Sequence, residues 1–218
     1  MNVIIDTGCA NLLSLKSAIE RLGYPVTISA VPMMIQQAER VFLPGVGTAK
    51  HAMKNLKASG LDEVIKALTQ PVLGICLGMQ LLTNSSKEGR NDELIDCLGI
   101  IPTSVDLLKA TDLEQQQKPL RVPHMGWNTY QSISDHPVFK GISSDDYFYY
   151  VHSYGAPLSP YTIAQCQYNI YADMQDSGDG AIFSAGIAKD NFIGVQFHPE
   201  RSGVMGSKLL QNFMEMAA

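Results

Sequence analysis

The sequence predicts an α/β fold: an open, mostly parallel sheet with helices on both faces, followed by a β-rich extension. Two patterns predict it. In the first half, short and almost continuously apolar runs alternate with stretches of helical periodicity, as in a parallel sheet covered on both faces. In the second half, strand-like runs lie among glycine and proline turns. The 218 residues, of which 45% are hydrophobic, suffice for one sizeable core. We therefore expect a single domain over residues 1–218.

The expected elements follow from these patterns in chain order. Each expected strand is a short apolar run, and each expected helix repeats apolar residues at helical spacing. In the first half the strands are Val3–Ile5, Val26–Ile28, Val41–Leu43 and Pro71–Ile75, and the helices are Leu12–Leu22, Thr48–Ala58, Leu61–Leu68 and a stretch from Leu77. In the second half the strands are Tyr147–Val151, Thr162–Gln165, Ala181–Ala188 and Phe192–Phe197, and the closing helix is Gly206–Met216. The acidic stretch Met174–Gly180 is interpreted as a surface loop.

Charge and cysteine content argue against several functions. With 16 Lys+Arg against 21 Asp+Glu the net charge is −5, which disfavours electrostatic binding to nucleic acid or to a membrane surface. No apolar run approaches the roughly 18 residues of a transmembrane helix, and the N-terminus does not resemble a signal peptide. The four cysteines have no metal-ligand spacing and are typical of thiols in a reducing compartment. We therefore expect a cytoplasmic protein without a metal or cofactor.

The sharpest local feature is G-I-C-L-G, in which an expected strand runs directly into an expected helix at Cys76. The spacing is that of a nucleophile elbow with cysteine in place of serine, and the flanking glycines allow the tight turn. At the start of a helix, the positive end of the helix dipole favours the thiolate form of the side chain. A buried structural cysteine between packing glycines is the alternative interpretation.

The second feature is H-P-E, which directly follows the last apolar run. In an extended chain, residues two apart point to the same side, so His198 and Glu200 would project together. A carboxylate that accepts from one ring nitrogen fixes the tautomer and leaves the other nitrogen to face a nucleophile. Since strand ends of an open α/β sheet meet at its carboxyl edge, the two features together predict a Cys-His-Glu triad. A surface turn is the alternative for this motif alone.

A glycine-bearing turn, P-G-V-G, follows another expected strand on the same edge of the sheet. Its backbone N–H groups could stabilise a developing oxyanion, together with the N–H of Leu77 after the elbow. By itself the turn is equally consistent with an ordinary connection between a strand and a helix.

The motifs P-G-V-G, G-I-C-L-G-M-Q and F-H-P-E-R-S-G, in this order, resemble those of the class I (triad-type) glutamine amidotransferases. More narrowly, the chain is similar to the glutaminase subunits of imidazole glycerol phosphate synthases, which serve histidine biosynthesis. That similarity rests on D-T-G-C-A-N-L near the N-terminus, P-H-M-G-W-N around Trp127 and Y-F-Y-Y-V-H-S-Y around His152. The resemblance covers essentially the whole chain and implies a flavodoxin-like fold. The stretch Met174–Gly180 is longer and more acidic than the family's usual hairpin.

The resemblance also implies a role for each matching residue. Cys76 would attack the side-chain amide of glutamine, forming a glutamyl thioester and releasing ammonia. His198, oriented by Glu200, would protonate the leaving nitrogen and then activate water. The backbone of the oxyanion hole would come from Val46, Gly47 and Leu77, and the substrate would be held by Gln80, Glu88, Ser153 and Tyr154. Judged without the resemblance, Glu88 would be a solvated charge and Tyr154 a packed aromatic.

The family passes its ammonia to a partner, a (β/α)8-barrel cyclase subunit, so the resemblance implies a heterodimer with ammonia channelling. Trp127, the only tryptophan, lies in what reads as a Gly/Asn turn, and interfaces are enriched in Trp and Arg. A core aromatic is the alternative for Trp127. The candidate partner-facing residues are Asn11, Met125, Trp127, Asn128 and Arg201.

Three other functions stay open at this point. One is the glutaminase component of anthranilate or aminodeoxychorismate synthase, and another is a cysteine hydrolase that does not use glutamine. The third is a catalytically silent binding module, against which the intact Cys76, His198 and Glu200 argue.

Overall fold

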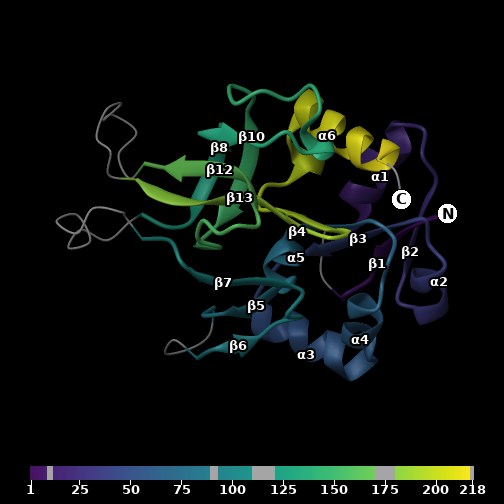
Figure 1. Cartoon of the computed structure of the whole chain (residues 1–218). Coiled ribbons are helices and arrows are strands. Elements are labelled where there is room, and N and C mark those ends of the chain that lie inside the picture. Colours follow the sequence, from purple (N-terminus) through teal and green to yellow (C-terminus); the bar gives the residue numbers. More distant parts are fainter. Residues whose placement is uncertain (9–11, 89–92, 110–120, 170–179, 217–218) are drawn as a thin grey trace.

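In the computed structural model, residues 1–8, 12–88, 93–109, 121–169 and 180–216 are described. Their largest element is an eight-stranded sheet in the order β2-β1-β3-β4-β14-β13-β12-β9 (Figure 1). The first five of these strands are parallel, and the last three run antiparallel to their neighbours. The strands are β1 (Asn2–Ile5), β2 (Val26–Ser29), β3 (Arg40–Gly45), β4 (Val72–Cys76), β9 (Ser132–Ile133), β12 (Thr162–Tyr168), β13 (Ala181–Lys189) and β14 (Phe192–Val195). The prediction of a mostly parallel sheet with a β-rich extension is confirmed.

Helices cover both faces of the parallel part because its strands are apolar on both sides. Successive residues of a strand point to opposite faces, so on β1 the side chain of Ile4 enters one core and those of Val3 and Ile5 enter the other. The first core is closed by α1 (Leu12–Arg21) and α6 (Gly203–Glu215), and the second by α2 (Pro32–Gln36), α3 (Ala49–Ser59), α4 (Leu61–Lys66) and α5 (Leu77–Leu81) (Figure 1).

Helix ends follow local sequence signals. Thr48 caps α3, where its side chain accepts a hydrogen bond from the backbone N–H of His51. Gly60 ends that helix in a left-handed conformation (φ 69°), which glycine adopts without steric cost. These signals place α3 and α4 within one or two residues of the ranges expected from periodicity.

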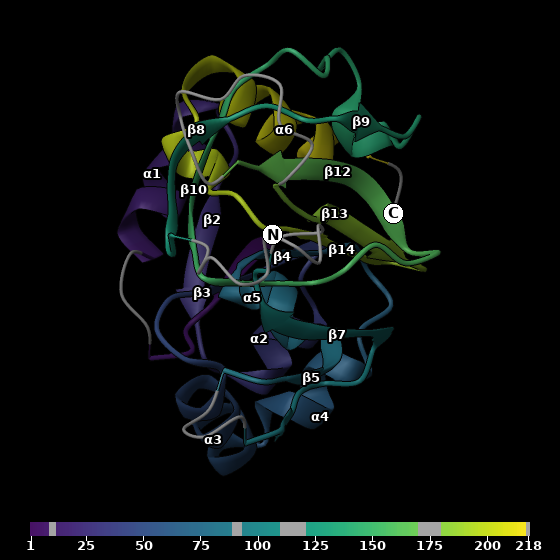
Figure 2. The same ribbon diagram turned by 90° about the vertical axis from the view of Figure 1, so that its left-hand side faces the viewer.

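Two smaller sheets flank the carboxyl edge of the parallel strands. One is an antiparallel ribbon of β8 (His124–Asn128) and β10 (Phe148–His152); the other has the order β11-β7-β5-β6. In Figure 2 the ribbon lies above the turn between β4 and α5, and the second sheet lies below it. Periodicity did not reveal β8 or the strands of the second sheet. Of the latter, β5, β6 and β11 have only two to four residues, and the seven-residue β7 includes Pro102 and buries Thr103 between its apolar residues. The second sheet consists of β5 (Thr83–Ser86), β6 (Ile95–Asp96), β7 (Ile101–Leu107) and β11 (Tyr154–Gly155).

The interpretation of Trp127 as part of a turn is wrong, because it lies within β8, directly opposite Tyr149 of β10. The ribbon exposes one face, so its strand carries no continuous apolar run. The loop expected over residues 174–180 lies, except for Gly180, outside the described residues. None of the helices formed by the described residues has the length and hydrophobicity needed to span a membrane.

Candidate active site

The turn at Cys76 joins β4 to α5 and carries the backbone strain of a nucleophile elbow. Cys76 has φ 53° and ψ −111°, a conformation that non-glycine residues rarely adopt and that clusters at functional sites. The two flanking glycines are required by contact distances. A Cβ on Gly78 would come within 1.7 Å of the Leu43 carbonyl oxygen, and one on Gly74 within 2.8 Å of the Gly78 oxygen. Strands β3 and β4 pack so closely against α5 that only glycine fits at these two positions. The turn places Cys76 at the carboxyl edge of the sheet.

His198 and Glu200 meet through a short helical turn. Glu200 Oε1 accepts a hydrogen bond from His198 Nδ1 over 2.9 Å, and the two side chains are only 4% and 6% exposed. His198 is extended (φ −103°, ψ 95°), but Pro199–Arg201 form a 3-10 helix, η4. The expectation of one extended segment is therefore wrong beyond His198. Proline favours the first position of a helical turn because its fixed φ suits it.

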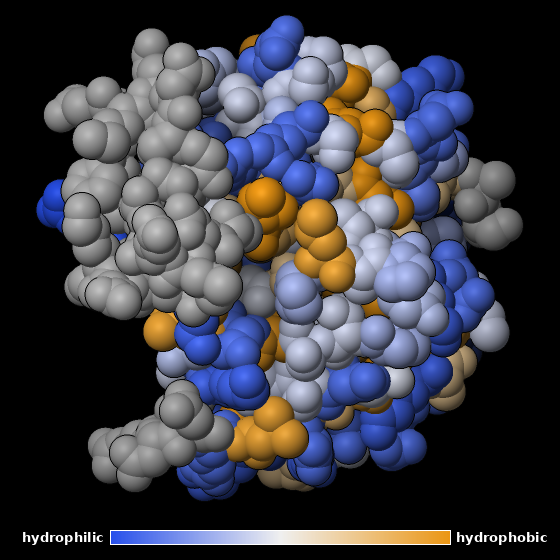
Figure 3. All heavy atoms as spheres, turned by 60° about the vertical axis from the view of Figure 1, so that its left-hand side comes forward, coloured by the Kyte–Doolittle hydropathy of each residue, from blue (hydrophilic) through white to orange (hydrophobic). Residues whose placement is uncertain are grey.

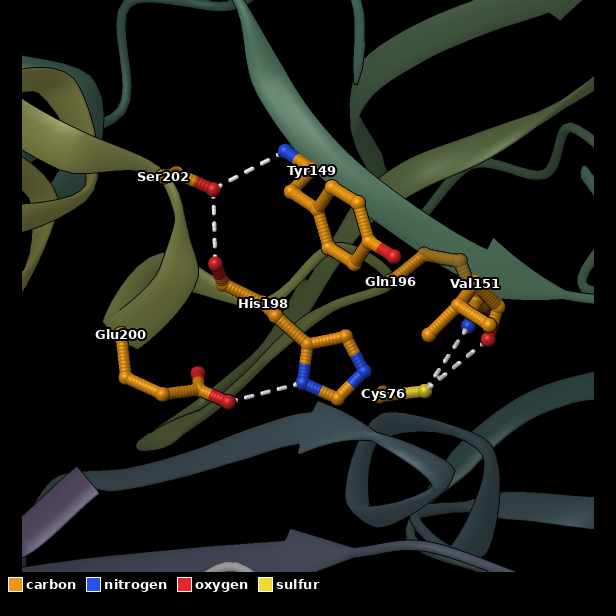
Figure 4. A network of polar contacts seen from close by, with 7 residues as sticks. All are labelled: Cys76, Tyr149, Val151, Gln196, His198, Glu200 and Ser202. Carbon is orange, nitrogen blue, oxygen red and sulfur yellow. Dashed lines mark hydrogen bonds and ion pairs between the residues drawn. The ribbon is translucent and has the colours of Figure 1, made fainter. Parts of the chain in front are cut away.

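The backbone of His198 is tied to β10 of the neighbouring ribbon. Its N–H donates to the Tyr149 carbonyl over 2.9 Å. Ser202 Oγ donates to the His198 carbonyl over 2.6 Å and accepts from the Tyr149 N–H over 3.0 Å (Figure 4). These bonds hold the histidine and the ribbon in one arrangement. Ser202 is not among the residues predicted from the sequence, although it lies inside the F-H-P-E-R-S-G motif.

The second ring nitrogen of His198 points toward the sulfur of Cys76 (Figure 4). Burial lowers the pKa of the imidazole, but the facing Cys76 sulfur and the Glu200 carboxylate outweigh burial and raise it to about 10. The arrangement therefore favours a protonated ring, with its Nε2 proton directed at the sulfur and its Nδ1 proton held by the carboxylate.

Gln196 provides a further contact to the sulfur. Its side-chain N–H donates to Cys76 Sγ over 3.8 Å, and Cys76 Sγ lies 4.0 Å from the Val151 carbonyl oxygen. Gln196 is fully buried and directly follows β14. The signal in the sequence is a polar residue inside the apolar run Phe192–Phe197, whose pattern otherwise predicts one uninterrupted strand.

A cavity of about 220 Å³ opens beside the sulfur. It receives residues from the P-G-V-G turn, the elbow, the end of β10 and the H-P-E turn, which lie far apart in the sequence. Two of the three triad candidates line it directly, and Glu200 lies behind His198. The lining residues are Val46, Gly47, Cys76, Leu77, Gln80, Glu88, Val151, His152, Ser153, Tyr154 and His198. All the residues predicted for the oxyanion hole and for substrate binding are among them.

Gln80 and Glu88 differ in how they reach this cavity. Both N–H donors of the buried Gln80 amide are used, with the Tyr154 carbonyl over 2.9 Å and Gln196 Oε1 over 3.0 Å. Glu88 Oε2 accepts from the backbone N–H of Ala49 over 2.9 Å, and burial raises the pKa of its carboxyl group. Glu88 therefore brings a partly desolvated acidic group to the cavity, whereas Gln80 holds neighbouring residues in place.

The partner-facing candidates separate into two groups. Met125 and Trp127 are 66% and 55% exposed, and the Arg201 guanidinium lies 5.8 Å from the ring centre of Tyr149, which contacts Trp127. Figure 3 views this side of the molecule and shows hydrophobic side chains exposed near the centre of the face. Asn128 instead turns inward, donating to the Gln167 carbonyl over 2.9 Å. Asn11 lies outside the described residues.

Other groups lie apart from this chemistry. Cys97 and Cys166 are buried, and burial raises the pKa of each thiol to about 12, as in structural cysteines. A larger, open groove of about 880 Å³ between Gln131 and Ser144 shares no residue with the cavity at Cys76. Among the described residues, no three His, Cys, Asp or Glu side chains gather as a metal site would require.

A strained cysteine at a strand-to-helix turn, facing a buried histidine–carboxylate pair on an α/β sheet, defines a class of enzymes with a cysteine nucleophile. Residues 3–217 match the glutamine amidotransferase class-I family, and the chain belongs to that family. It is a glutamine amidotransferase. A solved structure described as a glutamine amidotransferase has the same fold, with a TM-score of 0.67 over 98% of this chain and 97% of the other at 15% identity.

Closer relatives narrow the family further. The chain is 56% identical to the imidazole glycerol phosphate synthase subunit HisH of Colwellia psychrerythraea, over 99% of this chain and 92% of the relative. It is 53% identical to the HisH subunit of Vibrio cholerae, over 98% of both chains. These identities place the chain in the HisH family of glutamine amidotransferases.

Proposed function

We propose that this chain is the glutamine-hydrolysing subunit of an imidazole glycerol phosphate synthase, with Cys76, His198 and Glu200 as its catalytic triad. The observation that carries the triad is the buried His198–Glu200 pair, whose free ring nitrogen points at the strained Cys76 (Figure 4). The similarity to HisH subunits over almost the whole chain favours this function over anthranilate or aminodeoxychorismate synthesis.

The geometry supports a two-step reaction. The Cys76 sulfur attacks the side-chain amide carbon of glutamine, and the tetrahedral intermediate collapses as the C–N bond breaks. The leaving nitrogen takes the Nε2 proton of His198 and departs as ammonia, which leaves a glutamyl thioester and a neutral imidazole. That imidazole then takes a proton from a water molecule that attacks the thioester, and glutamate is released while the sulfur regains the pair of electrons. Glu200 holds the ring in the required tautomer throughout.

The cavity provides the remaining requirements. Val46, Gly47 and Leu77 line it beside the sulfur, where backbone N–H groups would stabilise the oxyanion. Glu88 would bind the α-ammonium group of glutamine, because a partly buried carboxylate gains most from a cationic partner. Ser153 and Tyr154 would complete the walls around the substrate. We infer that residues 1–218 form one domain dedicated to this reaction.

The consumer of the ammonia would be a (β/α)8-barrel cyclase subunit, bound over the exposed face of the β8–β10 ribbon. Met125, Trp127 and Arg201 lie on or beside that face. A direct route to a bound partner is chemically useful, because ammonia released into neutral water is mostly protonated and no longer nucleophilic. A biosynthetic complex of this kind, with reduced thiols, would act in the cytoplasm.

The test compares glutamine hydrolysis by the wild-type chain with that of Cys76→Ala, each alone and with the cyclase subunit. We expect Cys76→Ala to abolish hydrolysis while circular dichroism shows an intact fold. Cys97→Ala is the matched control, since Cys97 is a buried thiol outside the cavity, and it should retain hydrolysis. Unchanged hydrolysis in Cys76→Ala would refute the proposal.

A further inference from the structure

Two buried histidines lie beside the site and have no part in the mechanism above. His124 of β8 and His152 of β10 are directly opposite each other on the inner face of the ribbon, 3% and 6% exposed. His124 stacks against Tyr150 and Tyr168, with ring centres 4.8 Å and 4.2 Å apart. His152 also lines the cavity at Cys76.

Counting donors and acceptors assigns one tautomer to each ring. His152 Nδ1 lies 2.8 Å from the Tyr154 carbonyl oxygen, which can only accept, so Nδ1 carries the proton. In a neutral ring Nε2 is then an acceptor, and His124 Nδ1, 3.1 Å away, must donate to it. His124 Nε2 is left as an acceptor for the side-chain N–H of Asn128 at 3.3 Å. Every bond in this series has one possible direction.

The orientation of Asn128 is fixed independently. Its Nδ2 donates to the Gln167 carbonyl over 2.9 Å, and its Oδ1 accepts from the backbone N–H of Thr129 over 2.8 Å. In the flipped amide, Oδ1 would face the Gln167 carbonyl oxygen, acceptor against acceptor, and Nδ2 would face the Thr129 N–H, donor against donor. The series of bonds therefore begins at a defined donor on β8, next to the exposed Trp127.

At its other end the series reaches the nucleophile. The Tyr154 carbonyl that accepts from His152 also accepts from Gln80 Nε2 over 2.9 Å. The second N–H of Gln80 donates to Gln196 Oε1, and Gln196 Nε2 donates to the Cys76 sulfur. One carbonyl oxygen thus joins the two histidines to the amide pair that contacts the sulfur.

We propose that His152 and His124 are positioning residues for glutamine cleavage: each held in one tautomer, they fix the Tyr154 carbonyl and, through Gln80 and Gln196, the place of the Cys76 sulfur. This proposal rests on the proposed glutaminase function. Neither ring reacts with the substrate. Their contribution is to hold the cavity wall and the Gln80 amide in a single arrangement, since buried networks specify one structure only when every member is satisfied.

Burial supports the neutral state that these tautomers need. It lowers the pKa of His152 to about 4, with the nearby His198 acting in the same direction and the bond to Tyr154 opposing it. Burial, together with the adjacent His152, lowers the pKa of His124 to about 3. Both rings are therefore neutral at pH 7, each with a single proton on Nδ1, whereas His198 carries a second proton and is charged.

Paired substitutions separate a positioning role from simple packing. Asparagine places an N–H where His Nδ1 lies, so His152→Asn keeps the bond to Tyr154 and loses the one to His124. Glutamine reaches the place of Nε2, so His152→Gln keeps the bond to His124 and loses the one to Tyr154. Glutamine also fills more of the volume of the histidine than asparagine does. We expect His152→Gln to lower kcat about tenfold, the cost of one buried hydrogen bond, and His152→Asn to lower it less.

The same ranking is expected for His124→Asn and His124→Gln, because only asparagine keeps a donor toward His152. His136→Asn and His136→Gln are the matched controls, since His136 lies outside the cavity, and they should leave kcat unchanged. Steady-state glutamine hydrolysis gives kcat and KM separately, and circular dichroism checks the fold of each variant. If the histidines only filled space, kcat would be higher in the glutamine variants than in the asparagine variants at both positions. That result would overturn the proposal.

Imidazole ¹⁵N NMR of the histidine-labelled wild-type chain tests the tautomers without using activity. We expect the proton on Nδ1 in both His124 and His152 at pH 7. A proton on Nε2 in either ring would refute the proposal. If the wild-type chain hydrolyses no glutamine even with the cyclase subunit, the proposed function itself fails; wild-type hydrolysis with a fully active His152→Gln refutes the positioning role alone.

Discussion

The Glu88 carboxylate accepts a hydrogen bond from the backbone N–H of Ala49 over 2.9 Å, which connects the segment that follows β5 to the first residue of α3. This bond directs an acidic side chain into the cavity at Cys76 instead of leaving it in solvent. The neighbouring Lys87 points elsewhere, to Asp106, with an N–O distance of 2.6 Å. The carboxylate is therefore available to a cationic group of the substrate.

Replacing Glu88 with glutamine keeps an oxygen for the Ala49 N–H and removes the charge. We expect KM for glutamine to rise about 10- to 100-fold with a smaller effect on kcat, because a charge-assisted hydrogen bond contributes about 1.5–3 kcal/mol. Glu93→Gln is the control, since Glu93 is an exposed partner of Lys50. Steady-state kinetics measure both parameters, and equal KM values for the two variants would contradict a role in binding.

Replacing Glu200 with glutamine removes the carboxylate that holds His198. We expect hydrolysis to fall about 10²- to 10⁴-fold, by analogy with other triads in which the carboxylate is neutralised.

The pKa of His198 is raised from 6.5 to about 10, so its protonated ring stabilises the folded chain below about pH 6.5, and this contribution is lost as the pH rises through about 10. Between pH 6.5 and about 10, the free energy of unfolding should therefore fall less in Glu200→Gln than in the wild type.

Urea unfolding at several pH values between 6.5 and 10 measures that loss. Glu39→Gln is the control, because Glu39 is an exposed carboxylate that pairs with the N-terminus. The same pH dependence in wild type and in Glu200→Gln would show that the carboxylate does not hold the proton on His198.

Trp127 is 55% exposed and contacts the ring of Tyr149. If the ribbon binds the cyclase subunit, Trp127→Ala should weaken the complex about 30-fold, a cost of about 2 kcal/mol that is typical of a tryptophan at an interface centre. Met33→Ala on α2 is the control, since Met33 is 62% exposed at the opposite end of the sheet (Figure 1). Calorimetric titration with the cyclase gives both affinities, and equal values would place the interface elsewhere.

Gly78 has no room for a side chain, because a Cβ there would meet the Leu43 carbonyl oxygen at 1.7 Å. We expect Gly78→Ala to lower the free energy of unfolding by about 3 kcal/mol or more and to abolish hydrolysis, since β3 and α5 must separate. Gly60→Ala adds the same methyl group into open space at φ 69°, and should cost only about 1–2 kcal/mol. Denaturant unfolding that ranks the two variants in the reverse order would contradict the packing argument.

The sequence identified the parallel part of the sheet because each strand buried on both faces is an apolar run. It did not reveal β8, whose exposed face carries Met125 and Trp127, nor the strands of the second sheet. At the site, the G-I-C-L-G and H-P-E motifs indicated Cys76 and His198, since glycine permits a tight turn that other residues resist and proline restricts the backbone next to it. Gln196 and Ser202 went unrecognised because their contacts are made with residues distant in the chain.

The features that can be predicted from the sequence are therefore local: the alternation of strands and helices, the tight turn at the cysteine, and the histidine and glutamate of one short motif. Three features depend on the folded arrangement: His198 faces Cys76, Glu88 turns into the cavity, and His124 and His152 share one series of hydrogen bonds. The reason is physical. Backbone preferences act between near neighbours, whereas the direction of a buried hydrogen bond depends on which donors and acceptors the packed sheets bring together.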